Sequence, residues 1–218
     1  MSEPEVWLRG PIEGVPPHLQ PVAHSLLQSR EETERLLTGM SADQIWRGDG
    51  SAASVGFHIL HAMGSLDRLF TYARGAMLSD AQRQVLAQES QPDVDLSAID
   101  LIAGFDAAVE RALDQLRETS EERLIDARRV GRAGLPSTVM GLLFHAAEHT
   151  QRHVGQALTT SKLAKTHCRL SIGDWRVRIA ECRLRICRLS IADCRGKAQS
   201  PKPKAQSPKP KARGADCR

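Results

Sequence analysis

The sequence predicts an all-α protein: a four-helix bundle of the up-and-down type, followed by a basic C-terminal tail that is largely disordered. Four segments of roughly 16 to 25 residues place apolar side chains at helical spacing, and no convincing strand alternation interrupts them. The composition also changes sharply near residue 160. We therefore expect an extended lead-in over residues 1–20, the bundle over residues 21–160, and a repetitive tail rich in Arg, Lys and Pro over residues 161–218.

The charge distribution supports this division. Residues 1–160 contain 14 Lys and Arg against 22 Asp and Glu, whereas residues 161–218 contain 16 against 4. The body therefore carries a net charge of −8 and the tail +12, which the overall value of +4 conceals. Basicity of the whole chain is consequently no argument for nucleic-acid binding by the folded part.

The N-terminus lacks the basic start and apolar run of a secretory signal, and no later stretch approaches the length of a membrane span. We expect a cytoplasmic protein without a membrane partner. The cysteines lie at irregular spacings in the tail, without a C-x-x-C pair, so neither a disulfide framework nor a thiolate zinc site is indicated. They are Cys168, Cys182, Cys187, Cys194 and Cys217.

The first half of the body predicts a lead-in and two helices. Four prolines between residues 11 and 21 oppose helix and indicate an extended segment that docks on the body. A first helix over about Val22–Leu37 ends at Gly39, and a second, capped by Ser51 or Ser54, runs to about Gly75.

The second half adds a short helical stretch at 79–88 and two long helices. The third long helix covers about residues 96–116, where apolar residues trace a wide stripe. Residues 128–136 form a connector, after which Ser137 or Thr138 caps a fourth helix that extends to roughly Thr159.

The tail consists of tandem repeats, such as Ala-Gln-Ser-Pro-Lys-Pro-Lys at 198 and again at 205, and we expect disorder from about Gln199 onward. One interpretation is a basic arm for nucleic acid or an acidic membrane surface. The other is an extension with little selected role. We favour the second, because Trp175 is the one aromatic residue available there for base stacking.

Histidines on two helices provide the chemistry. His145, His149 and His153 follow one another at four-residue intervals, so adjacent imidazoles lie on one face of the last helix and two of them can hold one cation. His58 and His61 on the second helix offer a third ligand. The alternative interpretation is that these are hydrogen-bonded histidines at the margin of the core.

A capped apolar helix bearing His61, followed by His149-x-x-x-His153 and then Gly155-Gln156, resembles the DinB-like superfamily, which includes the YfiT-type metal-dependent hydrolases. The resemblance covers about residues 20–160. It implies that His61, His149 and His153 ligate a metal, with His61 rather than His58 matched by counting from Ser54.

The neighbouring side chains leave alternatives open. We expect His58 to be a hydrogen-bonded core residue beside the site, whereas His145 is a fourth ligand, a hydrogen-bond donor to a ligand, or a substrate contact. Gln156 either orients a ligand or lies exposed at the helix end. Glu148 is an interface or surface charge, and no catalytic carboxylate can be singled out.

Imidazole ligands suit a divalent transition metal, zinc before nickel, iron or manganese. Such an ion lowers the pKa of a bound water or thiol. The DinB-like superfamily, which the chain resembles, includes thiol-dependent S-transferases and a thiol-dependent isomerase. The expected substrate is a small molecule, with a low-molecular-weight thiol as a candidate, and the resemblance makes a homodimer plausible. We therefore expect a metal-dependent enzyme, either a small-thiol S-transferase or a hydrolase, and the alternative is a non-catalytic metal-binding stress or damage-response protein.

Overall fold

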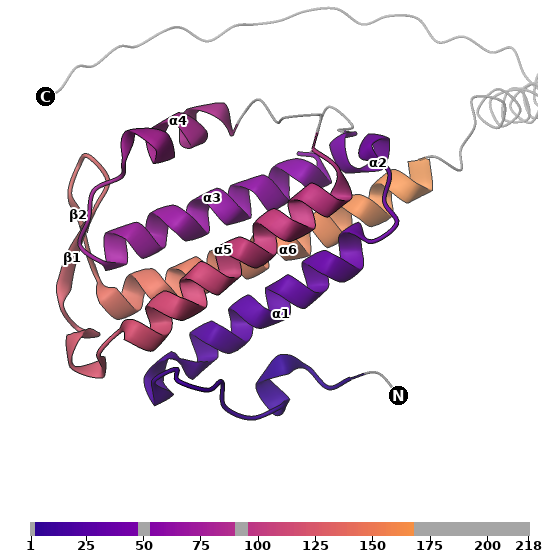
Figure 1. Cartoon of the computed structure of the whole chain (residues 1–218). Coiled ribbons are helices and arrows are strands. Elements are labelled where there is room, and N and C mark those ends of the chain that lie inside the picture. Colours follow the sequence, from indigo (N-terminus) through magenta and orange to yellow (C-terminus); the bar gives the residue numbers. More distant parts are fainter. Residues whose placement is uncertain (1–2, 48–52, 90–95, 168–218) are drawn as a thin grey trace, which may run out of the picture. The chain divides into compact units, whose positions relative to one another are not determined.

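The computed structural model describes residues 3–47, 53–89 and 96–167, which lie within a compact unit spanning Met1–Arg169. Four long helices form a bundle (Figure 1), so the all-α four-helix fold expected from the sequence is confirmed. The expected tail disorder concerns residues outside those described. The elements are η1 (Val6–Leu8), η2 (Pro17–Leu19), α1 (Gln20–Leu37), α2 (Ala42–Trp46), α3 (Val55–Ala73), α4 (Asp80–Gln88), α5 (Ala98–Glu118), η3 (Glu121–Arg123), β1 (Ala127–Val130), β2 (Leu135–Thr138) and α6 (Val139–His167).

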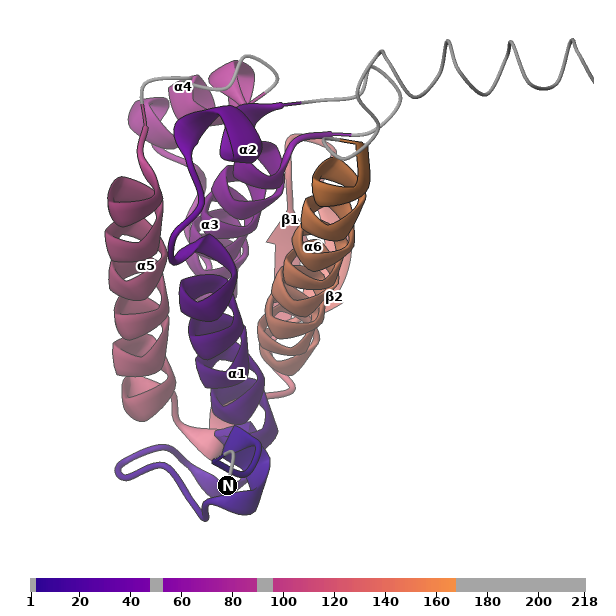
Figure 2. The same cartoon turned by 90° about the vertical axis from the view of Figure 1, so that its right-hand side faces the viewer.

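The four long helices are arranged as a ring in the order α1, α5, α3, α6. Each packs against its two ring neighbours, and α3 packs most extensively on α6. Figure 2 shows α5 and α6 on either side of α1, with α3 behind. Helices α3 and α5 run in the same direction (Figure 1). This is possible because α4, which joins them in the chain, runs back along α3. Helix α6 runs antiparallel to α3, which aligns the first half of α3 with the middle of α6.

Serine and threonine side chains cap the N-termini of the two helices that carry the histidines. Ser54 Oγ accepts a hydrogen bond from Phe57 N at the start of α3, and Thr138 Oγ1 accepts one from Gly141 N at the start of α6. Each hydroxyl satisfies an N–H group that the first helical turn leaves without a partner. Because these caps fix where each helix begins, they also set which residues face the neighbouring helix.

The core lies between the four helices and is made of aliphatic side chains with a few aromatic rings. Its largest fully buried members come from every helix of the bundle, and include Leu26, Leu66, Phe105 and Leu143. Burying one such side chain contributes about 1.5–3 kcal/mol of transfer free energy. This apolar interior holds the helices in register independently of the histidines.

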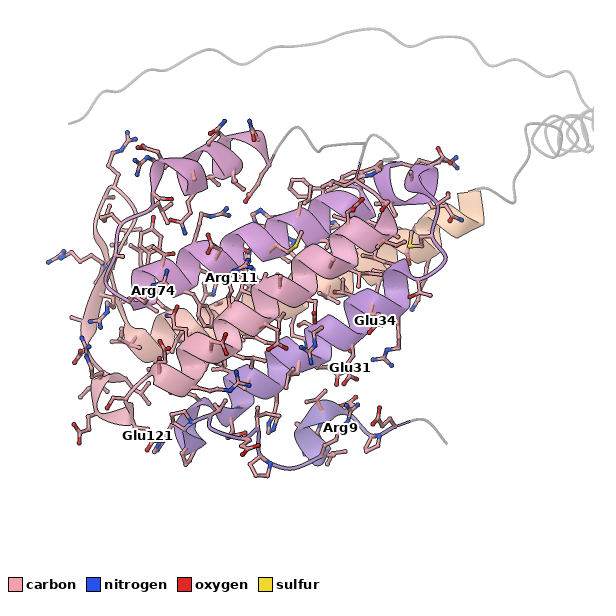
Figure 3. The ribbon with its side chains drawn as sticks, viewed as in Figure 1. Arg9, Glu31, Glu34, Arg74, Arg111 and Glu121 are labelled. Atoms are coloured by element: carbon pink, nitrogen blue, oxygen red, sulfur yellow. The ribbon has the colours of Figure 1, made fainter. Side chains whose placement is uncertain are left out.

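The N-terminal segment docks along α1 through polar contacts. The amide of Val6 donates to Gln28 Oε1 at 3.1 Å, and Arg9 pairs with both carboxylate oxygens of Glu31. Figure 3 shows Arg9 facing α1, from which Glu31 and Glu34 project. At the other end of α1, His18 Nδ1 lies 2.7 Å from Glu121 Oε1. The lead-in is therefore part of the folded unit.

Two features of the second half differ from the sequence-based expectation. The connector at 128–136 is a β-hairpin, in which β1 and β2 pair antiparallel with Val130 opposite Leu135. Its turn uses Gly131 and Gly134 at φ of 68° and 61°, a region that glycine enters without strain. The last helix continues eight residues beyond Thr159, to His167. No helix among the described residues combines the length and apolar character required to cross a membrane.

Candidate metal centre

Helices α3 and α6 bring three half-buried histidines together at their interface. His61 lies in the second turn of α3, whereas His149 and His153 lie one turn apart on α6. His61 faces both residues of α6, with its ring centroid 5.3 Å from that of His149 and 4.5 Å from that of His153. One ring nitrogen of each histidine lies within 4.8 Å of the other two. The structure thus brings together the three histidines that sequence analysis singled out.

The ring nitrogens of this three-histidine cluster converge. His61 Nε2 and His149 Nε2 are 3.1 Å apart, and the ring centroid of His153 lies 4.5 Å from that of His61 and 4.6 Å from that of His149. Two nitrogen ligands at about 2.0–2.1 Å from one tetrahedral ion would be about 3.3 Å apart. The spacing of His61 and His149 therefore fits coordination of a single ion.

The outer nitrogens of the cluster have three different environments. His61 Nδ1 lies 2.8 Å from Glu89 Oε2, and His153 Nδ1 lies 3.2 Å from His58 Nδ1. His149 Nδ1 is buried and has no hydrogen-bond partner among the described residues. Since Nδ1 of His61 and of His153 is engaged outside the cluster, Nε2 is the nitrogen that each leaves for a ligand. This donor set fits a divalent transition metal.

A family model for the DinB superfamily matches residues 25–157. The chain belongs to the DinB superfamily. No curated protein matches it significantly. Two of the solved structures that match this chain illustrate the shared fold. A conserved protein from Enterococcus faecalis has 18% sequence identity and a TM-score of 0.53, covering 68% of this chain and 97% of its own. A DinB-like protein from Bacillus cereus has 14% identity and a TM-score of 0.51, covering 64% and 91%.

Burial lowers the pKa of His149 and of His153 in this DinB-superfamily chain, which favours their neutral imidazoles. Desolvation is the largest cause that lowers the pKa of His153, to about 4, and the positive charge that His61 can carry lowers it further. Desolvation, followed by the same neighbour, also lowers the pKa of His149 and of His58. A neutral imidazole keeps the lone pair that a metal requires. His149 and His153 therefore keep their lone pairs available to a cation at neutral pH.

The two further histidines have different surroundings. His58 is buried and contacts His153, so it is a hydrogen-bonded core histidine beside the cluster, as the sequence analysis favoured. His145 is exposed, lies 3.4 Å from Glu148, and is outside the group of three that could share one ion. Its ring centroid is 5.5 Å from that of His149, so His145 lies beside the cluster.

The remaining polar candidates on α6 lie at the surface. Glu148 pairs with Arg152 and with His145, which agrees with its interpretation as a surface charge. Hydrogen bonding from Arg152 is the main cause that lowers the carboxyl pKa of Glu148. Gln156 is exposed on the same helix, and among the described residues it makes no hydrogen bond to His61, His149 or His153.

Sequence reasoning missed the side chains that surround His61. Phe57 stacks on its ring, with centroids 5.7 Å apart and planes inclined by 11°. Glu89, at the end of α4, reaches its Nδ1 atom, and Arg68 pairs with Glu89. Phe57 lies four residues before His61, which is a detectable spacing on a helix. Glu89 is 28 residues away in the sequence, and no local pattern connects it to the histidine.

Proposed function

We propose that this DinB-superfamily chain is a metal-dependent enzyme, which either transfers a small thiol to an electrophile or hydrolyses a small substrate. The observation that supports this most is the convergence of His61, His149 and His153 from two helices, with no fourth His, Cys, Asp or Glu of the described residues in the group. Three protein ligands with one free position are typical of catalytic zinc, whereas structural zinc sites are usually closed by four.

The three residues would hold zinc, or another divalent transition metal such as nickel, iron or manganese, through neutral nitrogens. When bound, the ion would supply a Lewis acid that lowers the pKa of a water or thiol in the open position. The chain itself orients the three ligands: Phe57 packs on the ring of His61, and His58 engages the outer nitrogen of His153. The buried surroundings also reduce competition by protons for the ring nitrogens.

The source of the thiol follows from the positions of the cysteines. All five lie from residue 168 onward, and the bundle itself contains none. A thiol-dependent reaction would therefore use a low-molecular-weight thiol as a cosubstrate rather than a cysteine of the bundle. A homodimer belongs to the same proposal, and light scattering of the full chain tests it.

The experiment combines metal loading with two substrate panels. Full-length protein loaded with Zn²⁺ is incubated with low-molecular-weight thiols and electrophiles, and separately with small ester and amide substrates. We expect turnover in one panel that disappears with chelator and in His149→Ala. His145→Ala, which changes an exposed histidine of the same helix, is the matched control and should retain turnover. A loaded protein that turns over neither panel would instead support the non-catalytic metal-binding alternative.

A further inference from the structure

Helix α4 carries Glu89 to the metal centre although the helix itself is peripheral. None of its residues is buried, and Gln82 makes hydrogen bonds to α3. Gln82 Nε2 donates to Asp67 Oδ2 at 2.7 Å and to Thr71 Oγ1 at 2.8 Å. At the end of the helix, by contrast, the side chain of Glu89 is only 9% exposed. The most deeply placed contact of α4 with the bundle is thus a carboxylate at the candidate metal centre.

The carboxylate of Glu89 has two partners on α3. Its Oε2 lies 2.8 Å from His61 Nδ1, and Arg68 donates to both oxygens, with Nη2 3.3 Å from Oε2. The side chain of Arg68 is only 11% exposed. Because a buried carboxylate is costly without a counter-charge, the guanidinium of Arg68 compensates the charge that Glu89 brings to His61.

Gly64 makes this approach sterically feasible. A Cβ atom at position 64 would overlap Glu89 Oε1 and lie 2.9 Å from Arg68 Nη1. Glycine in the interior of a helix costs about 0.5–1 kcal/mol relative to alanine. Glycine at position 64 therefore lowers the stability of α3 at the turn where the carboxylate of Glu89 contacts the helix.

We infer that Glu89 is a positioning residue for the metal ligand His61, with Arg68 as its counter-charge. A carboxylate can only accept a hydrogen bond, so Glu89 selects the tautomer of His61 that carries its proton on Nδ1. The lone pair then lies on Nε2, the nitrogen that faces His149. Carboxylate partners of this kind fix the ring orientation of a ligating histidine and increase its basicity. This inference rests on the proposed metal centre.

Metal affinity provides the first test. Zn²⁺ binding to full-length protein is measured by competition with a chromophoric chelator for the wild type, Glu89→Ala and Glu89→Gln. We expect Glu89→Ala to weaken binding about 10- to 100-fold, as loss of such partners does elsewhere. Glu89→Gln should lie between the two, because its amide oxygen can still accept the Nδ1 proton. Glu148→Gln is the matched control: it removes an exposed carboxylate next to His149 and should change affinity less than about threefold.

The tautomer of His61 provides a test without metal. In metal-free protein, the imidazole ¹⁵N shifts should report a proton on Nδ1 of His61 in the wild type and loss of that preference in Glu89→Ala. Circular dichroism should show the bundle intact in both variants, since α4 buries no residue. Equal Zn²⁺ affinity and an unchanged His61 tautomer in Glu89→Ala would overturn the role of Glu89 and leave the proposed function standing. A wild type that binds no Zn²⁺ would overturn the proposed function, and the positioning role with it.

Discussion

Replacing Gly64 with alanine displaces Glu89 without removing any of its atoms. A Cβ at this position overlaps Glu89 Oε1, and the carboxylate has to retreat by about 1 Å to reach ordinary contact distance. A comparable displacement of Oε2 would lengthen its 2.8 Å contact with His61 Nδ1 beyond hydrogen-bond range. We therefore expect Zn²⁺ affinity to fall about 10- to 100-fold, the effect of losing an outer partner of a ligand.

The same substitution should weaken Zn²⁺ binding but stabilise helix α3 itself. Alanine in a helix interior is favoured over glycine by about 0.5–1 kcal/mol, so metal-free Gly64→Ala should not be strongly destabilised even if the Arg68 pair is disturbed. Gly155→Ala on α6 is the matched control, because a Cβ there meets nothing within 4 Å. It should stabilise the protein without changing Zn²⁺ affinity. Chelator competition and urea unfolding in EDTA measure the two quantities, and equal affinities for both variants would refute the reasoning.

Three further predictions concern other parts of the unit. Leu143→Ala, in the fully buried core, should lower the free energy of urea unfolding by about 2–5 kcal/mol, and a loss below about 1 kcal/mol would contradict its placement. His145→Ala should leave the metal content per chain unchanged in elemental analysis, whereas a halved content would make His145 a ligand. Hydrogen bonding from Arg9 lowers the carboxyl pKa of Glu31 below 4.5. The stability that this pair contributes is present above about pH 4.5 and is lost as the pH falls through the lowered pKa. The difference in thermal midpoint between the wild type and Glu31→Gln should therefore shrink from pH 6 to pH 3.5, and a constant difference would exclude this linkage.

The sequence predicted the helices well where local signals agree. Ser54 and Thr138 were among the cap candidates, and both accept the expected backbone hydrogen bonds. The His149 and His153 pair was visible because a four-residue spacing returns to the same helix face. Assigning His61 as their partner from α3 required the family resemblance, since no spacing within one helix relates residues on two.

Features that depend on tertiary contacts were not predicted. The hairpin of β1 and β2 was interpreted as a connector because each strand has only four residues, too few for a clear alternation. The parallel course of α3 and α5 follows from the return of the chain along α4, which periodicity does not report. Glu89 was missed for the same reason: its contact with His61 exists only after α4 folds back on α3.

The most direct measurement of the central claim is the metal content of the purified full-length protein, together with anomalous scattering from its crystals. We predict about one divalent transition-metal ion per chain, located between His61, His149 and His153, and its loss from His149→Ala while the helical bundle stays folded. Protein that contains no such ion after incubation with Zn²⁺, or an ion located elsewhere, would contradict the account.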